Sequence, residues 1–338
     1  MSERYPSPLA LRDVTLSDLA TRYGFELVGA DGPVHFFGRI KMGRDGISGV
    51  LSYVTAPEYL SSFAQSPHEY ALVERRFVGD GLPANKSWLV CDGMADEWLF
   101  QMHIDAVEAG LFSKVPSHVD PTARVHPSAV VMDNVHIGAG SRIDANVVLY
   151  PNTFIGEDVH IMANSTLGGE GFETKYVFGE RKLIPHTGGV IIESSVTIGS
   201  STCVDCGLFG TFTRVGAGAH IDNLCYIAHN AIIGEDAGIV GGSSVLGSVT
   251  VGRGAWWGPG SVSNHEVVIG DYAYIGTGAV LTRDIPAHGL AFGAPAKVRG
   301  WACRCRNKLD VVDGAATCSK CGTKVQMGDD GQLAIVSD

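Results

Sequence analysis

Apolar residues return every six positions along two long stretches of the chain, residues 119–167 and 215–281, with three more such positions between them. The positions are Val119, Val125, Val131, Ile137, Ile143, Leu149, Ile155, Ile161, Leu167, Ile192, Ile198, Val204, Val215, Ile221, Ile227, Ile233, Ile239, Val245, Val251, Trp257, Ser263, Ile269, Ile275 and Leu281. Only Ser263 breaks the apolar rule. An amphipathic helix has a period near 3.6 and a half-buried strand a period of two. A period of six is instead typical of a parallel β-helix, whose coils stack their inward side chains on one another.

The repeat is interrupted at residues 168–189, "GGEGFETKYVFGERKLIPHTGG", and then resumes. Glycines at both ends allow the chain to turn out and back. A loop of this length is uncommon inside a compact fold unless it is functional or disordered, so we interpret it as a functional insertion. A one-residue slip in phase between Val204 and Val215 predicts a smaller bulge there.

Two histidines hold equivalent places on the repeat. His229 and His265 are each the second residue after an inward position, and they lie 36 residues apart. With eighteen residues per coil, they project from one face, two strand spacings or about 10 Å apart. Gly247 holds the matching place in the coil between them and leaves a gap for a thin, extended ligand. Histidine suits general-base chemistry because its ordinary pKa lies near neutrality.

Three segments resemble a known family: "IDNLCYIAHNAIIGEDAGIVGG" (221–242), "GGEGFETKYVFGERKLIPHTGGVII" (168–192) and "SVSNHEVVIG" (261–270). They are similar to the UDP-3-O-acylglucosamine N-acyltransferases of the lipid A pathway. The resemblance implies a left-handed β-helix with three strands per coil, and a homotrimer. It also implies that His229 is the base that deprotonates a sugar amine, that Asp222 is its polar partner with Asn223 beside it, and that His265 lines the acyl-donor channel.

The same resemblance implies further substrate contacts. The excursion matches the family's substrate loop at Gly169, Gly171 and Phe172, with Glu170 in place of an aspartate, and His186 in the same stretch is assigned to the substrate. The segment "GISGVLSYVTAPEYL" (46–60) resembles the family's uridine site, in which two aromatic side chains clamp the uracil. Tyr53 and Tyr59 hold those places, and a tyrosine ring stacks well on a flat base.

Residues 1–115 lack the six-residue period and predict a small α/β domain that binds a uridine-type nucleotide. "TLSDLATRYGFELVG" predicts a helix capped by Thr15 or Ser17 and followed by a strand. A second amphipathic helix is expected over 96–112, and strands over 49–54 and 70–77. The β-helix domain is expected over 116–300, with the excursion at 168–189, and a separate tail over 301–338.

The tail carries four cysteines in two close pairs, which resemble a zinc ribbon. Cys303, Cys305, Cys318 and Cys321 are expected to hold a structural zinc ion, because four thiolates leave no open position on the metal. The remaining four are expected to be packing residues: Cys91, Cys203, Cys206 and Cys225. Just before the tail, "GAPAKV" resembles the loop that lies against coenzyme A in sugar acetyltransferases. We assign Lys297 and Arg299, with Gly247, to the acyl donor.

Composition narrows the classes of function. The chain has 338 residues, 44 of them glycine, and a net charge of −11, which argues against general nucleic-acid binding. No run of eighteen apolar residues predicts a membrane span. The first twenty residues lack the basic and apolar layout of a signal peptide, so a cytoplasmic protein is expected.

These observations predict an N-acyltransferase that moves an acyl group from an acyl-CoA or acyl carrier protein thioester to the amine of a nucleotide-linked amino sugar. Three alternatives stay open: an O-acyltransferase of the same fold, a zinc enzyme of the γ-carbonic anhydrase type, and a non-catalytic scaffold. The zinc enzyme needs three metal-binding histidines, with two of them five residues apart, and no two histidines here have that spacing.

Overall fold

The computed structural model describes residues 10–40, 48–113 and 115–337. The first nine residues of the expected non-signal N-terminus, and residues 46 and 47 of the uridine-type motif, lie outside the described residues. The chain forms two compact units. The first contains Met1–Val115, Phe172–Gly188 and Leu208–Thr211, and the second contains Pro116–Gly171, Gly189–Gly207 and Phe212–Asp338.

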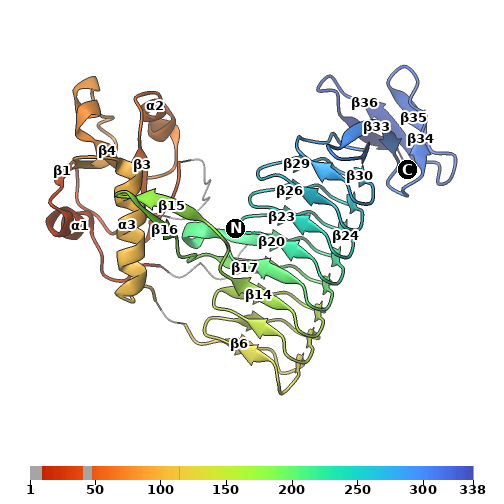
Figure 1. Ribbon diagram of the computed structural model, residues 1–338, viewed down its shortest axis with the longest axis horizontal. Coiled ribbons are helices and arrows are strands. Elements are labelled where there is room, and N and C mark those ends of the chain that lie inside the picture. Colours follow the sequence, from red (N-terminus) through yellow and green to blue (C-terminus); the bar gives the residue numbers. More distant parts are fainter. Residues whose placement is uncertain (1–9, 41–47, 114, 338) are drawn as a thin grey trace. The chain divides into compact units, whose positions relative to one another are not determined.

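The first unit is built on a five-stranded sheet with the order β1-β5-β4-β3-β2 (Figure 1). The strands are β1 (Glu26–Val28), β2 (Phe36–Phe37), β3 (Val50–Val54), β4 (Tyr70–Glu74) and β5 (Ser87–Cys91). The helices are α1 (Leu16–Tyr23), α2 (Glu58–Gln65) and α3 (Ala95–Glu108), with a 3-10 helix η1 (Arg75–Asp80) after β4. Strand β1 is antiparallel to β5, and the other neighbours are parallel. The predicted α/β class of this region is therefore confirmed.

Local sequence explains where these elements begin and end. Thr15 caps α1, with its hydroxyl accepting from the Asp18 N–H while the Asp18 carboxylate accepts from the Thr15 N–H. Gly24 ends the helix with a left-handed φ of 72°. Both predicted helices are present. The expected strand over 70–77 is wrong beyond Glu74, because the chain turns into η1, and α2 was not predicted.

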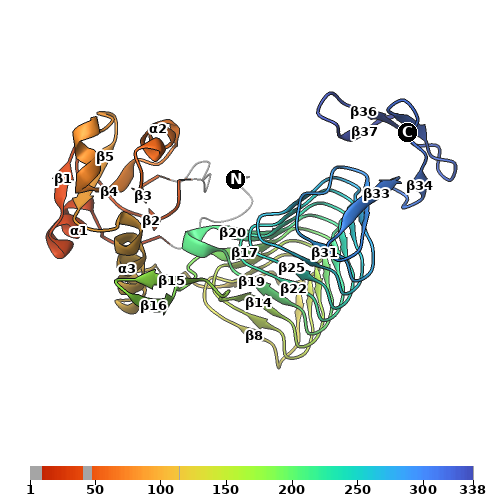
Figure 2. The ribbon, with the colours of Figure 1, turned by 45° about the horizontal axis from the view of Figure 1, so that its top comes forward.

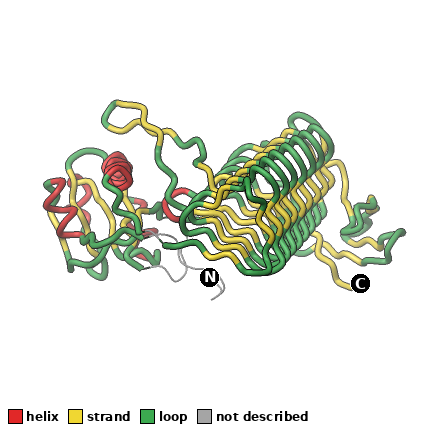
Figure 3. The backbone as a smooth tube through the Cα atoms, turned by 90° about the horizontal axis from the view of Figure 1, so that it is seen from below, coloured by secondary structure: helices red, strands yellow, loops and turns green. Residues whose placement is uncertain are grey.

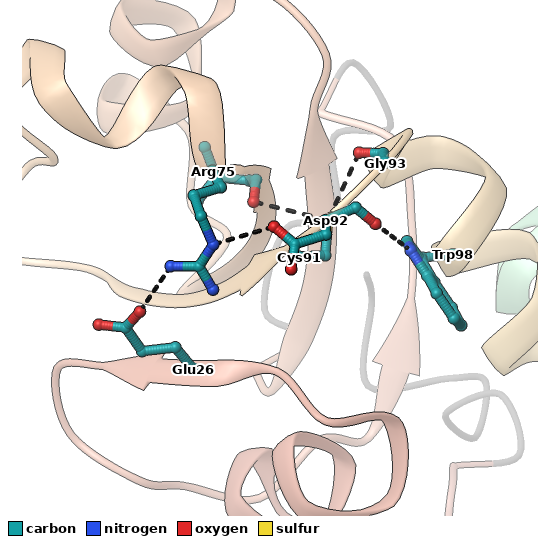
Figure 4. A network of polar contacts seen from close by, with 7 residues as sticks. Glu26, Arg75, Cys91, Asp92, Gly93 and Trp98 are labelled. Carbon is teal, nitrogen blue, oxygen red and sulfur yellow. Dashed lines mark hydrogen bonds and ion pairs between the residues drawn. The ribbon is translucent and has the colours of Figure 1, made fainter.

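Arg75 ties the edge strand to the rest of this sheet (Figure 4). Its Nη1 donates to Glu26 Oε2 and its Nε to Asp92 Oδ1, both at 2.9 Å. Trp98 Nε1 donates to the Asp92 carbonyl oxygen at 2.8 Å. These charged groups are exposed, so solvent screens them and each pair contributes little. Burial raises the pKa of the neighbouring Cys91 thiol to about 12, which fits the packing role expected for it.

The excursion from the repeat is an antiparallel hairpin of β15 (Thr174–Val177) and β16 (Glu180–Leu183). It packs on α3 within the first unit (Figure 1). Val177 and Ile184 are fully buried in the same hydrophobic cluster as Leu99 of α3. Polar contacts add to this packing: Lys182 Nζ donates to Gln101 Oε1 at 2.8 Å.

The second unit stacks short strands into three parallel faces, which the chain visits in turn (Figures 2 and 3). The first face contains β6 (His118–Val119), β9 (His136–Ile137), β12 (Thr153–Ile155), β17 (Gly189–Ile192), β20 (Phe212–Val215), β23 (Ile232–Ile233), β26 (Thr250–Val251) and β29 (Val268–Ile269). The second contains β7 (Arg124–Val125), β10 (Arg142–Ile143), β13 (His160–Ile161), β18 (Thr197–Ile198), β21 (His220–Ile221), β24 (Gly238–Ile239), β27 (Trp256–Trp257), β30 (Tyr274–Ile275) and β32 (Gly289–Phe292). The third contains β8 (Val130–Val131), β11 (Val148–Leu149), β14 (Thr166–Gly169), β19 (Cys203–Asp205), β22 (Tyr226–Ile227), β25 (Ser244–Val245), β28 (Val262–Ser263) and β31 (Val280–Leu281). The predicted parallel β-helix is confirmed, and its strand pattern is consistent with the expected left hand.

The core of the β-helix consists of the predicted inward residues together with a second inward row, two residues earlier, that the sequence analysis missed. Members of that row include Val135, Ala219 and Ala255, all at most 1% exposed. The exception in the repeat, Ser263, is 2% exposed and its hydroxyl accepts from the Leu246 N–H at 3.1 Å. Val119, in the first coil, is 40% exposed, so the expectation that every phased position is buried is wrong there.

The predicted bulge between Val204 and Val215 is present as a 3-10 turn, η2 (Leu208–Gly210). Cys206 and Cys225 are buried as expected, but Cys203 is exposed. It stands at an outward position of β19, where the Thr166 hydroxyl donates to its sulfur at 3.3 Å. The packing role predicted for Cys203 is therefore wrong.

The tail continues from the last coil. Strands β33 (Lys297–Ala302) and β34 (Lys308–Leu309) extend the second face, and β35 (Ala315–Thr317), β36 (Lys324–Met327) and β37 (Leu333–Ser337) form a three-stranded sheet. Leu309, Val325 and Leu333 make a small core with two cysteines. Among the described residues, no helix has the length and apolar character needed to cross a membrane.

Candidate active site

His229, Gly247 and His265 lie one above another at a single corner of the β-helix. Each follows a strand of the third face, β22, β25 and β28, before the chain turns to the first face. A Cβ atom built on Gly247 would be 2.8 Å from His229 Nε2 and 3.0 Å from His265 Nδ1. Both imidazoles therefore lean over the glycine, and only a residue without a side chain fits between them.

The contact made by His229 Nδ1 bears on which ring nitrogen carries the proton. Its Nδ1 lies 3.2 Å from Asn230 Oδ1. An amide oxygen only accepts, so this contact is a hydrogen bond in the tautomer with the proton on Nδ1. In that tautomer the unprotonated nitrogen is Nε2, which lies on the side of Gly247. That is the arrangement needed for an imidazole to take a proton from a ligand held there.

Asp222 and Asn223 lie at a different corner, between β21 on the second face and β22 on the third. The Asp222 carboxylate accepts from two backbone N–H groups, those of Asn223 at 2.8 Å and Gly241 at 3.0 Å. Both residues border a hollow of about 340 Å³ on the second face, together with His220, Gly238 and Trp256. Within one chain, β22 separates Asp222 from His229.

A buried carboxylate that was not predicted from sequence lies in the coil before His229. Asp205 ends β19, is 8% exposed and accepts a hydrogen bond from the Tyr226 hydroxyl at 2.6 Å. Burial raises the pKa of Asp205 to about 6, although the bond from Tyr226 acts in the opposite direction. Asp205 directly follows the inward position Val204, but the one-residue slip in phase after Val204 hid its relation to the corner residues of the other coils. Without that slip, its distance from Val204 would have been the signal that marks it.

The predicted substrate loop is divided between the two units. Gly169 ends β14 and its carbonyl oxygen accepts from the Cys206 N–H at 2.9 Å, and Gly171 is buried. Phe172 belongs to the first unit and is 80% exposed. His186, also in the first unit, is 8% exposed with its Nδ1 at 3.1 Å from the Ile184 carbonyl oxygen.

The two tyrosines of the expected nucleotide site lie in the first unit. Tyr53 is on β3, and Tyr59, which is 44% exposed, is the second residue of α2. Burial raises the pKa of Tyr53, and the charge of Arg39 opposes this. Arg39 Nη2 also donates to Glu173 Oε1 at 2.7 Å. This cation next to Tyr53 was not predicted, because the residues that position it are 134 apart in sequence.

The four tail cysteines converge. Their sulfur atoms all lie within 4.8 Å of one another, with Cys303 and Cys321 at 3.5 Å and Cys305 and Cys318 at 3.6 Å. Zinc–sulfur bonds of about 2.3 Å in a tetrahedron would put the sulfurs about 3.8 Å apart. The donor set therefore fits a tetrahedral zinc ion. In the described part of the chain, this is the only group of three or more potential ligand side chains brought together in this way.

Several basic residues lie in the tail or just before it. Lys297 and Arg299, expected at the acyl donor, are exposed on β33. Arg306, between two of the cysteines, stacks on Trp256 of β27 with its guanidinium carbon 4.0 Å from the ring centre. Trp256, Tyr274, Arg306 and Lys320 line a polar pocket of about 410 Å³.

Part of the chain matches a known family model, and known proteins are similar to it in sequence and structure. Residues 248–283 match the model of the bacterial transferase hexapeptide (six repeats). The matched residues lie within the β-helix of three stacked faces. A UDP-N-acetylglucosamine O-acyltransferase from Moraxella catarrhalis is similar in structure, with a TM-score of 0.38 and 24% identity over 55% of this chain and 72% of that one.

Many known proteins are similar in sequence, and two of them are described below. The UDP-3-O-acylglucosamine N-acyltransferase of Wolinella succinogenes is 35% identical over 132 residues, which is 39% of this chain and 41% of the relative. The dTDP-3-amino-3,6-dideoxy-alpha-D-galactopyranose 3-N-acetyltransferase of Aneurinibacillus thermoaerophilus is 42% identical over 84 residues, 25% of this chain and 43% of the relative. The matched part of the chain thus spans about two fifths of the length of each of these two relatives.

Proposed function

We propose that this protein is an N-acyltransferase that moves an acyl group from a thioester to the amine of a nucleotide-linked amino sugar. The observation that carries the proposal is the pair of imidazoles that lean over Gly247. Both relatives described above are named as N-acyl transferring enzymes of nucleotide-linked amino sugars, which supports this substrate class. Tyr53 and Tyr59 would hold the nucleobase, and the loop residues Gly169, Gly171, Phe172 and His186 would contact the sugar.

The proposed chemistry places the thioester carbonyl in the gap above Gly247. The amine nitrogen attacks the carbonyl carbon, and His229 Nε2 takes a proton from that nitrogen. The tetrahedral intermediate then collapses: the C–S bond breaks, the amide remains, and His229 returns the proton to the leaving thiolate. A well-placed general base of this kind contributes about 10²–10⁴-fold to the rate. His265 would border the acyl donor on the other side of the gap.

The acyl donor is an acyl-CoA or an acyl carrier protein thioester. Lys297 and Arg299 are exposed cations that suit the phosphates of either donor. A structural zinc ion held by Cys303, Cys305, Cys318 and Cys321 would fix the tail, since four thiolates leave no open coordination site.

A homotrimer fits the proposal for a geometric reason. Asp222 and His229 occupy different corners of one chain, so the partnership expected between them would need a neighbouring subunit to bring its own Asp222 to the base. A cytoplasmic location stays a prediction from the sequence.

The test is a thioester-consumption assay with UDP- and dTDP-linked amino sugars as acceptors and acetyl-CoA or longer acyl-CoA as donors. His229→Ala is expected to lose at least about hundredfold in kcat while its melting temperature stays unchanged. Asn264→Ala, at an exposed position of the same β-helix, serves as the control for substitution at this corner. A His229→Ala rate close to that of the wild type would contradict the mechanism.

A further inference from the structure

Asp205 is a buried carboxylate in the coil next to that of the candidate base, and the chemistry described above does not use it. Val204 pairs with Ile227 in the parallel ladder, so Asp205 lies one strand spacing, about 4.8 Å, from Ala228, which precedes His229. One carboxylate oxygen, Oδ2, is fixed by the Tyr226 hydroxyl at 2.6 Å. At 8% exposure, the group has lost most of its contact with water.

In the described part of the chain, no basic side chain is paired with the negative charge at this corner. Gly169 pairs with Asp205, which places Glu170 beside it in the preceding coil. The pKa of the Cys206 thiol is raised to about 12, first by burial and then by the negative charges of Asp205 and Glu170. Both carboxylates therefore influence the same thiol. Among the described residues, no lysine or arginine forms an ion pair with Asp205 or Glu170. A buried carboxylate without a cation is costly, and a cationic ligand would relieve that cost.

We propose that Asp205 and Tyr226, with Glu170 at the edge, form a subsite for the primary ammonium group of the acceptor. This inference rests on the proposed function and adds how the enzyme selects an amine over a hydroxyl group. An aliphatic amine reaches the site largely as an ammonium ion at neutral pH. The carboxylate binds that charge next to His229, while a sugar hydroxyl carries no charge for it to bind.

The same carboxylate acts again during the reaction. The bound ammonium ion first releases one proton through His229 to solvent, which leaves the neutral amine. When that nitrogen attacks the thioester carbon, it becomes positively charged a second time, until His229 takes the next proton and gives it to the leaving thiolate. Asp205 stabilises this positive nitrogen. General-base attack by a hydroxyl oxygen needs no such partner, so the subsite favours N-acyl transfer.

The test compares ligands that differ only in the amine. Calorimetry measures binding of UDP-glucosamine against UDP-glucose, and of dTDP-3-amino-3,6-dideoxygalactose against dTDP-6-deoxygalactose, to the full-length protein. The wild type is expected to prefer the amine in at least one pair. Asp205→Asn, which keeps an acceptor for Tyr226, is expected to lose about tenfold to hundredfold in affinity for the amine and less than about twofold for the hydroxyl ligand.

Two further variants make the result decisive. Asp236→Asn, at an exposed turn of the same β-helix, removes a carboxylate elsewhere and is expected to change neither affinity. Tyr226→Phe is expected to lose part of the amine preference, and it covers the case in which Asp205→Asn does not fold. An equal loss for amine and hydroxyl ligands, or no amine preference in the wild type, overturns the subsite. Absence of acyl transfer by a wild type that still shows the Asp205-dependent preference would instead overturn the proposed reaction.

Discussion

Replacing Asp205 with asparagine is expected to stabilise the fold at neutral pH even though it impairs amine binding. The pKa of this carboxyl group is raised from its ordinary 3.8 to about 6 in the folded chain, chiefly by burial. Between these two values, the folded state keeps a proton that the unfolded chain has lost. Folding stability therefore falls as the pH rises from about 4 to about 6, and it stays lower above that range.

The size of the effect follows from the two pKa values. A tenfold change in proton affinity is worth about 1.4 kcal/mol, so the ionised Asp205 costs the fold up to about 3 kcal/mol at pH 7. Solvent screening reduces this little, because the side chain is 8% exposed. Asparagine occupies the same volume without the charge and still accepts a hydrogen bond from Tyr226. We expect a gain of about 1–3 kcal/mol in the free energy of unfolding.

Urea unfolding followed by circular dichroism measures this gain at pH 7.5, 5 and 4. The advantage of Asp205→Asn is expected to be largest at pH 7.5 and to approach zero at pH 4, where the native carboxyl group is protonated. Asp236→Asn, at an exposed turn, should show no gain at any of these pH values. A loss of stability in Asp205→Asn that is equal at pH 7.5 and pH 4 would refute the idea that burial of the charge governs this site.

Three other substitutions test the remaining structural claims. Gly247→Ala places a methyl group 2.8 Å from His229 Nε2 and 3.0 Å from His265 Nδ1, so kcat/KM should fall by about hundredfold with an unchanged melting curve, and a wild-type rate would contradict the gap above the glycine. Metal analysis is expected to find one zinc ion per chain in the wild type and none in Cys318→Ser. The substitution should also alter the fluorescence of Trp256, on which Arg306 stacks. A variant that retains one zinc ion per chain would place the metal elsewhere. Ser263→Ala leaves the Leu246 N–H without its acceptor and should cost about 1–3 kcal/mol in unfolding, whereas an unchanged midpoint in urea would mean that solvent replaces the hydroxyl.

The repeat could be predicted from sequence because its signal is local and is copied in every coil. Each inward position sits six residues after the last, so phase alone located Ile227 and placed His229 relative to it. The gap between His229 and His265 followed from counting, and the position of Gly247 between the two rings agrees with that count. The capped helix after Thr15 could be predicted for the same reason: its signals lie within four residues of one another.

The features that could not be predicted from the sequence depend on contacts between segments that are far apart in the chain. The excursion looked like a loop in the β-helix, yet Val177 and Ile184 are buried against α3, since a short hairpin gains more by covering an existing core than by remaining exposed. Arg39 and Glu173 pair across 134 residues, and no local pattern marks either one.

The sequence by itself determined the periodic scaffold and the corner at which His229 and His265 stand, because spacing along a regular repeat fixes direction in space. It also indicated the grouping of the four tail cysteines, through their two close pairs. Only the tertiary structure decided which carboxylate is buried near the base. The sequence pointed to Asp222 and not to Asp205. The Asp222 carboxylate, however, accepts hydrogen bonds from backbone N–H groups at another corner, while Asp205 is buried and accepts a hydrogen bond from the Tyr226 hydroxyl. Burial and the direction of a side chain at an irregular turn arise from packing between coils, which no single segment of the chain encodes.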